Sequence, residues 1–200
     1  MRLIVVGFLA AALSSAALNH IYIDQRQDVQ GAKQFGSAGP YERIAAKAMY
    51  DSPASIPMEF LKPRDPSKGN GALVVMTDGK SGLPEALMQR GYTVLRLKTA
   101  DPAAVREMVS FLRYGGGPDA FLLGDQKRFL KRAILVGEAP VAQAILATNA
   151  NDKSKRLIDA VVISGAKPYQ AAEGVKVAHA KIDLSAAVLE IDGQLSPAAP

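Results

Sequence analysis

The sequence predicts an α/β protein whose sheet is mostly parallel and doubly wound, with helices on both faces and an antiparallel segment on its N-terminal side. Two observations support this prediction. From Ala72 onward, short apolar runs alternate with helical patterns, and strand–helix–strand units of this length need right-handed crossovers between parallel strands. Before Ala72, extended runs are separated by turn residues, as is typical of antiparallel strands.

The composition is that of one globular domain. The chain has 200 residues, of which 48% are hydrophobic and 22% charged. It contains no cysteine, which excludes thiol catalysis, disulfide frameworks and cysteine-based zinc sites. The two histidines, His20 and His179, are too few for a multi-histidine metal site. We therefore expect neither a metal nor another cofactor.

The first residues have the pattern of a secretory signal peptide. Arg2 precedes an apolar run from Leu3 to Leu13, and small residues follow up to a cleavage point after Ala16 or Ala17. The run is far shorter than the ~20 residues that a membrane-spanning helix needs. We expect a signal peptide at residues 1–16, one domain at residues 17–200, and a secreted or periplasmic protein with no integral membrane segment after cleavage. The formal charge of +5 is a mild excess, so no nucleic-acid partner is expected.

Extended segments and a first helical unit are predicted in the N-terminal half. The antiparallel strands are expected at His20–Asp24, Arg43–Tyr50 and Pro57–Lys62. The apolar run Ala72–Thr77 is typical of a strand that is buried on both faces of a parallel sheet. A helix that starts at Pro84 and stops at Gly91 should then lead into a strand at Tyr92–Leu97.

The clearest amphipathic helix begins after Asp101, with apolar residues spaced i, i+3, i+4 and i+7: Val105, Met108, Val109 and Leu112. We further predict a basic helix from about Gly124 to Arg132 and a strand at Ala133–Val136. Another helix should begin near Val141, and two strands should follow at Asp159–Ser164 and Ala186–Ile191.

The turn after the strand Ala133–Val136 is the main candidate site, because ligands of open α/β sheets bind at the carboxyl ends of the strands. It leads directly into a helix, which is the setting of the nucleophile elbow G-x-S-x-G. Gly137 supplies the first glycine of that pattern. Ala139 occupies the nucleophile position, and Val141 replaces the second glycine.

Four segments resemble, in order, a little-characterised secreted group of the α/β-hydrolase family that has an N-terminal Phe-Gly-x-x-Gly-Pro-Tyr-Glu motif. They are residues 35–44, where the motif reads Phe35-Gly-Ser-Ala-Gly-Pro-Tyr-Glu42, and residues 61–73, 105–114 and 123–132. The resemblance covers most of residues 21–166. It implies an α/β-hydrolase-like fold and hydrolysis of esters by a serine nucleophile.

The elbow departs from the pattern that this resemblance implies, Gly-x-Ser-Gln-Ser-Gly. Ala139 has a methyl group where a hydroxyl would form the acyl-enzyme. Pro140 lacks the backbone N–H that the residue after the nucleophile gives to the oxyanion hole. Losing one such donor costs roughly 2.7 to 4 kcal/mol of transition-state stabilisation. Proline is also favoured at the first position of a helix, so a turn retained for folding explains Pro140.

The remaining triad members are also missing from their expected places. The triad order in this fold is Ser, then Asp or Glu, then His. Ser196 stands where the resemblance would place the acid, and no histidine follows it. His179 comes too early and is interpreted as a solvated residue. Two other serines are alternative nucleophiles: Ser81, next to Lys80, and Ser164, at a strand end. Both can also be interpreted as ordinary turn residues.

One glycine run and two basic clusters have a structural interpretation. The run at residues 115–118 lacks the spacing of a phosphate-binding loop. The basic cluster of Lys127, Arg128, Lys131 and Arg132 and that of Lys153, Lys155 and Arg156 are interpreted as solvated helix faces, because no aromatic residues are interleaved for base stacking. Weak binding to an anionic surface or a polyanion is the alternative.

Two functional hypotheses from different classes follow. The first is an α/β-hydrolase-like protein without the Ser-Asp-His triad, an esterase-like pseudoenzyme that acts as a binding or structural module for an unknown small-molecule ligand. The second is an active carboxylic ester hydrolase that uses a relocated serine or is completed by a partner chain. A shortened sheet with an exposed edge would favour self-association.

Overall fold

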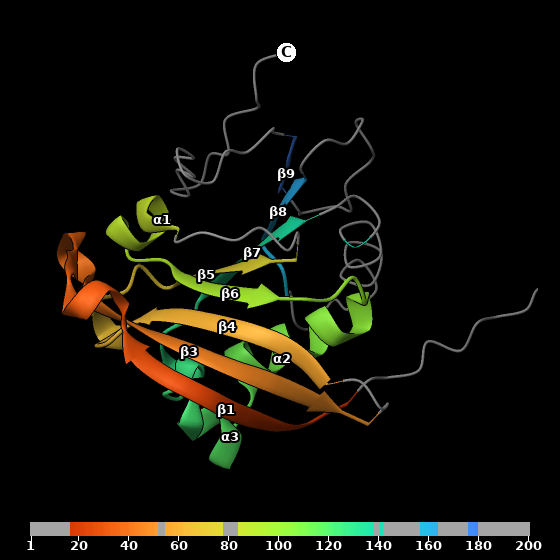
Figure 1. Cartoon of the computed structure of the whole chain (residues 1–200). Coiled ribbons are helices and arrows are strands. Elements are labelled where there is room, and N and C mark those ends of the chain that lie inside the picture. The colour runs from red at the N-terminus through yellow and green to blue at the C-terminus, as the bar shows by residue number, and fades with distance from the viewer. Residues whose placement is uncertain are drawn as a thin grey trace, which may run out of the picture.

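A computed structural model of the protein describes residues 17–51, 55–77, 84–137, 141, 157–163 and 176–179, with Ile163 and residues 176–179 described by their backbone. The described strands form one sheet in the order β1-β3-β4-β6-β5-β7-β8-β9, and β2 pairs with β3 (Figure 1). The strands are β1 (Leu18–Asp28), β2 (Gln34–Phe35), β3 (Gly39–Tyr50), β4 (Ser55–Pro63), β5 (Ala72–Met76), β6 (Thr93–Leu97), β7 (Arg132–Gly137), β8 (Ala160–Ile163) and β9 (Lys176–His179).

The sheet is mixed, with an antiparallel N-terminal side and a parallel remainder, as the sequence predicts. β3 pairs antiparallel with β1 and β4, and β4 pairs antiparallel with β6. From β6 through β5, β7 and β8 to β9, every pairing is parallel. All five residues of β5 are buried, as expected for a strand with both faces covered, whereas burial along β3 largely alternates.

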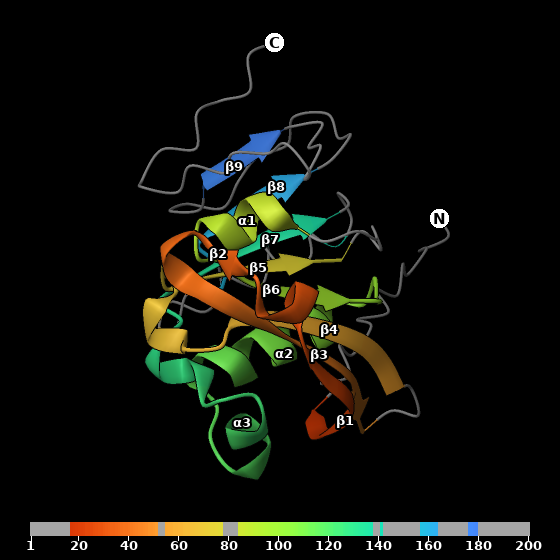
Figure 2. The same cartoon turned by 60° about the vertical axis from the view of Figure 1, so that its left-hand side comes forward.

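Helices cover both faces of the sheet, which confirms the doubly wound arrangement. Leu73 and Val75 of β5 belong to the core under α2 (Pro102–Tyr114), and Val74 and Met76 belong to the core under α1 (Glu85–Gln89) (Figures 1 and 2). Because successive strand residues point to opposite faces, the two cores lie on opposite sides. The four apolar residues predicted for the amphipathic helix are all buried in α2.

The capping of α2 explains where this helix begins. The Asp101 side chain accepts a hydrogen bond from the backbone N–H of Ala103 at 2.9 Å, and Pro102 occupies the first turn. The other described helical segments are α3 (Pro118–Leu122) and the 3-10 segments Val29–Ala32, Gly36–Ala38, Pro66–Lys68 and Gln126–Arg128. Among the described residues, no helix is long and apolar enough to cross a bilayer.

The prediction of a basic helix from Gly124 to Arg132 is wrong. Gly124 has a φ of +86° and Asp125 a φ of +47°, and a continuous right-handed helix cannot accommodate these left-handed residues. The segment instead holds the short 3-10 turn Gln126–Arg128 before β7 begins. No strand was expected at β9. Val141 is helical, as predicted, but the rest of its helix and the predicted strand 186–191 lie outside the described residues.

Candidate functional site

The strand order reverses at β5, and this reversal locates the candidate site. β5 lies between β6 and β7, and it is parallel to both. The chain moves from β5 to β6 on one side and then, after α2 and α3, to β7 on the other. In an open α/β sheet, ligands bind outside the carboxyl ends of the strands at such a reversal. The site should therefore lie beyond Met76 of β5 and Gly137 of β7.

The ends of these two strands touch closely. The backbone N–H of Thr77 donates to the carbonyl of Val136 at 3.0 Å, which continues the pairing of β5 with β7. A Cβ atom at position 137 would lie 2.3 Å from the Thr77 Oγ1. This contact explains why glycine occupies the first position of the turn. The Thr77 Oγ1 is buried and has no hydrogen-bond partner among the described residues.

The described ranges contain only part of the predicted site. Gly137 ends β7, as the strand–turn–helix pattern predicts, and Val141 beyond it is buried. Ala139, Pro140, Ser81 and Ser164 lie outside the described residues. The mixed sheet, with this turn beside the strand-order reversal, is consistent with the α/β-hydrolase-like fold that the sequence resemblance implies.

His179 lies in the same row of the sheet as Gly137. Gly137 pairs with Ile163 of β8, and Ile163 pairs with His179 of β9. Two strand spacings correspond to about 10 Å between the outer Cα atoms. The sequence interpretation placed His179 in a solvated stretch and missed the strand that carries it. The alternation of Val175 and Val177 was the available signal, but four residues are too few to establish a period.

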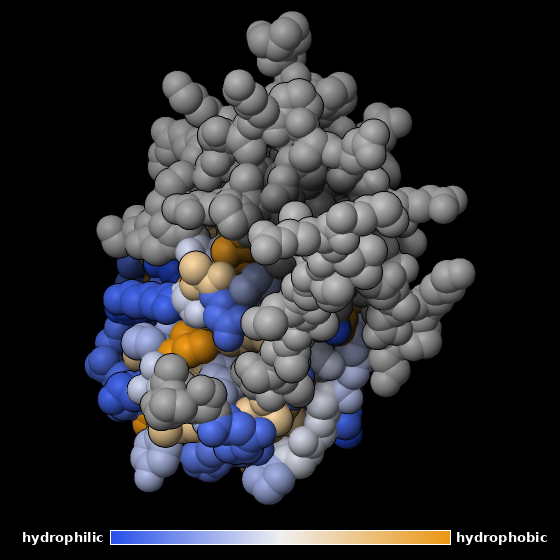
Figure 3. Space-filling model, turned by 90° about the vertical axis from the view of Figure 1, so that its right-hand side faces the viewer, coloured by the Kyte–Doolittle hydropathy of each residue, from blue (hydrophilic) through white to orange (hydrophobic). Residues whose placement is uncertain are grey.

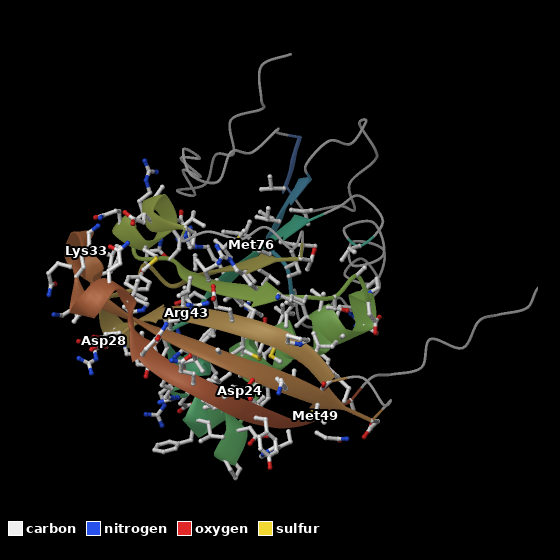
Figure 4. All side chains as sticks on the ribbon, in the orientation of Figure 1. Asp24, Asp28, Lys33, Arg43, Met49 and Met76 are labelled. Carbon is white, nitrogen blue, oxygen red and sulfur yellow. The ribbon has the colours of Figure 1, made fainter. Side chains whose placement is uncertain are left out.

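An ion-pair network borders the site on the α1 side of the sheet. Arg96, which pairs with Met76 in the strand register, donates from Nη1 to the Glu59 Oε1 at 2.8 Å. The Arg43 Nε donates to the other oxygen of Glu59 at 2.6 Å. Because side chains alternate along a strand, these three side chains lie on the same face of the sheet as the Met76 side chain. Arg43 and Met76 are labelled in Figure 4. With two guanidinium partners, Glu59 is better suited to holding β3, β4 and β6 together than to accepting a proton.

Figure 3 views the molecule from the side toward which the β6 and β7 arrowheads point in Figure 1. Where described residues are visible there, the surface is mainly hydrophilic and carries small hydrophobic areas. Within the described ranges, no three His, Cys, Asp or Glu side chains are grouped so that they could hold a metal ion.

A nucleophile paired with a base does not occur among the described residues. Their serines are Ser37, Ser55, Ser67 and Ser110, and none has a hydrogen bond to a histidine or lysine nitrogen within these ranges. The Ser67 Oγ instead donates to Asp65 Oδ1 at 2.6 Å. That bond, together with the one from the Ser67 backbone N–H, lowers the pKa of the Asp65 carboxyl and stabilises a surface turn.

No family model matches the sequence, and no curated protein matches it. Among solved structures, the chain is similar to acetyl xylan esterase 1 from Thermoanaerobacterium sp. JW/SL YS485, with 12% identity, 72% of this chain and 51% of that chain covered, and a TM-score of 0.45. An esterase from Aspergillus oryzae has 14% identity, coverage of 75% and 35%, and a TM-score of 0.42. A cold-adapted esterase from an Arctic intertidal metagenomic library has 14% identity, coverage of 76% and 75%, and a TM-score of 0.45. At this level of similarity, no property of these esterases extends to this chain.

Proposed function

We propose that this chain is a non-catalytic α/β-hydrolase-like protein, a binding or structural module whose ligand site lies at the carboxyl ends of β5 and β7. One observation carries the proposal. The turn after β7 begins at Gly137, beside the strand-order reversal, and its nucleophile position is filled by Ala139. The position at which a serine hydroxyl would meet a bound ester therefore offers only a methyl group.

The chemistry of acyl transfer supports the same conclusion from a second direction. A covalent intermediate needs an oxygen or sulfur nucleophile, and Ala139 supplies neither. The developing oxyanion needs backbone N–H donors, and Pro140 has no N–H. Without these groups, the site still occupies the topological position at which open α/β sheets bind ligands. A small molecule that is bound but not transformed is the ligand class that fits such a site.

The competing function is an active serine ester hydrolase. The observation in its favour is the row Gly137, Ile163 and His179, because a histidine backbone lies at the same edge of the sheet as the elbow. Ser164 follows β8 directly and Ser81 follows β5 after a short segment, so both candidate nucleophiles come after strands that end at this edge. A partner chain could also complete such a site.

A fluorophosphonate probe separates the two functions, since it labels activated serines covalently. We expect no labelling of the purified chain and no turnover of p-nitrophenyl acetate, with a known serine esterase as the positive control. Labelling that is lost in Ser81→Ala, Ser164→Ala or His179→Ala would establish the active enzyme instead. Repeating the labelling in unfractionated extract of the producing cells tests completion by a partner chain.

We also propose that the protein is exported to the periplasm or the cell exterior. The support is the pattern of Arg2, the apolar run Leu3–Leu13 and the small residues before Ala17. The intact mass of the protein recovered outside the cytoplasm should correspond to a chain that begins at residue 17 or 18. A full-length mass for that material would contradict cleavage.

A further inference from the structure

Three large apolar side chains are exposed on α3 and at the end of the preceding helix α2. The large hydrophobic residues that are exposed in the described part of the chain are Tyr22, Met49, Tyr114, Phe121 and Leu122. Three of them lie within nine residues: Tyr114 is 40% exposed, Phe121 79% and Leu122 37%. A single exposed apolar residue is ordinary, but such a group on one short segment marks an interaction surface.

Specific contacts hold α3 so that these side chains remain outside. The Asp119 Oδ2 accepts a hydrogen bond from the backbone N–H of Ile21 at 3.2 Å and lies 3.2 Å from the His20 Nδ1. Arg26 donates to the carbonyl of Leu122. These contacts fix α3 against the edge strand β1, and Figure 2 shows α3 at the periphery of the molecule. Phe121 therefore projects from an anchored helix.

Two exposed cationic side chains, Lys127 and Arg128, lie beside α3 and share one carboxylate. Arg128 is 75% exposed and places its Nε 2.9 Å from the Asp125 Oδ2, and Lys127 shares the same carboxylate at 4.0 Å. The Asp125 backbone N–H donates to the carbonyl of Ala120 in α3, so both cations lie beside the helix.

We propose that the α3 tip, defined as Tyr114, Phe121, Leu122, Lys127 and Arg128, is a peripheral membrane-binding site for anionic phospholipid. Aromatic and aliphatic side chains insert at the boundary between headgroups and acyl chains, while lysine and arginine remain at the level of the anionic headgroups. This inference is independent of the proposed ligand site, which lies at the carboxyl ends of β5 and β7.

A lipid surface fits this patch better than a second copy of the chain does. A stable protein interface buries about 800 Å² per partner, in roughly 20 to 30 residues. The apolar part of the α3 tip consists of three side chains, and a buried aromatic contributes roughly 150 to 250 Å². Insertion into a bilayer needs no such area, because a small apolar group and nearby cations act together.

Vesicle sedimentation of the purified protein tests the proposal. We expect binding to vesicles of equal parts phosphatidylglycerol and phosphatidylcholine, weaker binding as salt rises, and little binding to phosphatidylcholine alone. Lys127→Glu/Arg128→Glu should reduce the partition coefficient roughly tenfold or more, since two charges are reversed. Phe121→Ser should also reduce it, because it removes the apolar anchor.

Lys33→Glu is the matched control. Lys33 is an exposed lysine that pairs with Glu85 beside α1, away from the α3 tip (Figure 4). Its charge reversal should reduce binding far less than Lys127→Glu/Arg128→Glu. Equal binding to the two vesicle types, or unchanged binding of Phe121→Ser, would overturn the proposal. A chain that ignores both vesicle types but forms a dimer that Phe121→Ser abolishes would assign the tip to a second copy instead.

Discussion

The guanidinium of Arg113, near the end of α2, lies 3.0 Å from the carboxylate of Asp159, the residue before β8. Its two terminal nitrogens also donate to the carbonyls of Leu157, at 2.6 Å, and Lys131, at 2.7 Å. Asp159 in turn accepts the backbone N–H of Ala133 at 2.8 Å. One buried side chain thus connects α2 to the beginnings of β7 and β8, and β7 is the strand that presents the candidate site.

Arg113→Met should lower the free energy of unfolding by about 3 kcal/mol, because it leaves a partly buried carboxylate and two carbonyls without their partner. Urea unfolding followed by circular dichroism measures this loss. Lys33→Met is the control, since solvent screens the exposed Lys33–Glu85 pair and its loss should cost far less. Equal losses in the two variants would contradict the structural role assigned to Arg113.

Gly137→Ala should destabilise the protein by roughly 1 to 3 kcal/mol, because the added Cβ would overlap the Thr77 Oγ1. Thr77→Ala removes that oxygen, so the double variant Thr77→Ala/Gly137→Ala should recover most of the loss. Thr77→Val/Gly137→Ala should not recover it, since a methyl group is as large as the hydroxyl. Additive losses in the alanine double variant would show that the contact is not the cause.

Alkaline pH should destabilise the protein through its two buried tyrosines. Burial raises the pKa of Tyr41 and of Tyr50, and Glu107 and Asp101 raise the pKa of Tyr50 further. Above about pH 10 the unfolded chain therefore loses phenolic protons that the folded chain retains, and stability falls as pH rises. Urea midpoints between pH 7 and pH 11 measure this decrease.

Tyr50→Phe should make the alkaline decrease shallower. At pH 7 the same substitution should cost about 1 kcal/mol, because the Tyr50 hydroxyl donates to the carbonyl of Ala104 at 3.0 Å. Tyr22→Phe, at an exposed position, should change neither quantity. An unchanged alkaline slope in Tyr50→Phe would rule out this tyrosine as a source of the pH dependence.

The sequence predicted those elements whose patterns are local. The continuous apolar run of β5 and the apolar spacing of α2 each arise within one segment, and both segments fold as expected. The basic segment 124–132 also has helical composition, but Gly124 and Asp125 adopt left-handed backbone conformations that the composition does not reveal. β9 was missed because Lys176–His179 is too short to display a period.

The candidate site was predictable only in part. Gly137 could be placed because an apolar strand runs into a turn and a helical pattern. The Thr77 contact that requires a glycine there depends on pairing between strands that are some 60 residues apart, and no local pattern encodes it. The alignment of His179 with Gly137 depends on two further pairings. Relations of this kind follow from the register of the sheet.

Ala139→Ser should not create an esterase. The introduced hydroxyl would still lack its expected partners, since neither His20 nor His179 follows Ser196, where the sequence resemblance places the acid, and Pro140 would still withhold an oxyanion donor. Because one missing donor costs roughly 2.7 to 4 kcal/mol of transition-state stabilisation, turnover of p-nitrophenyl acetate should stay at the level of the parent chain.

Ala139→Ser/Pro140→Gly restores the donor but not the base, and it should also remain inactive. Circular dichroism and urea unfolding would confirm that both variants are folded. Clear turnover by Ala139→Ser alone would mean that a base already faces this turn, and the non-catalytic function would have to be abandoned.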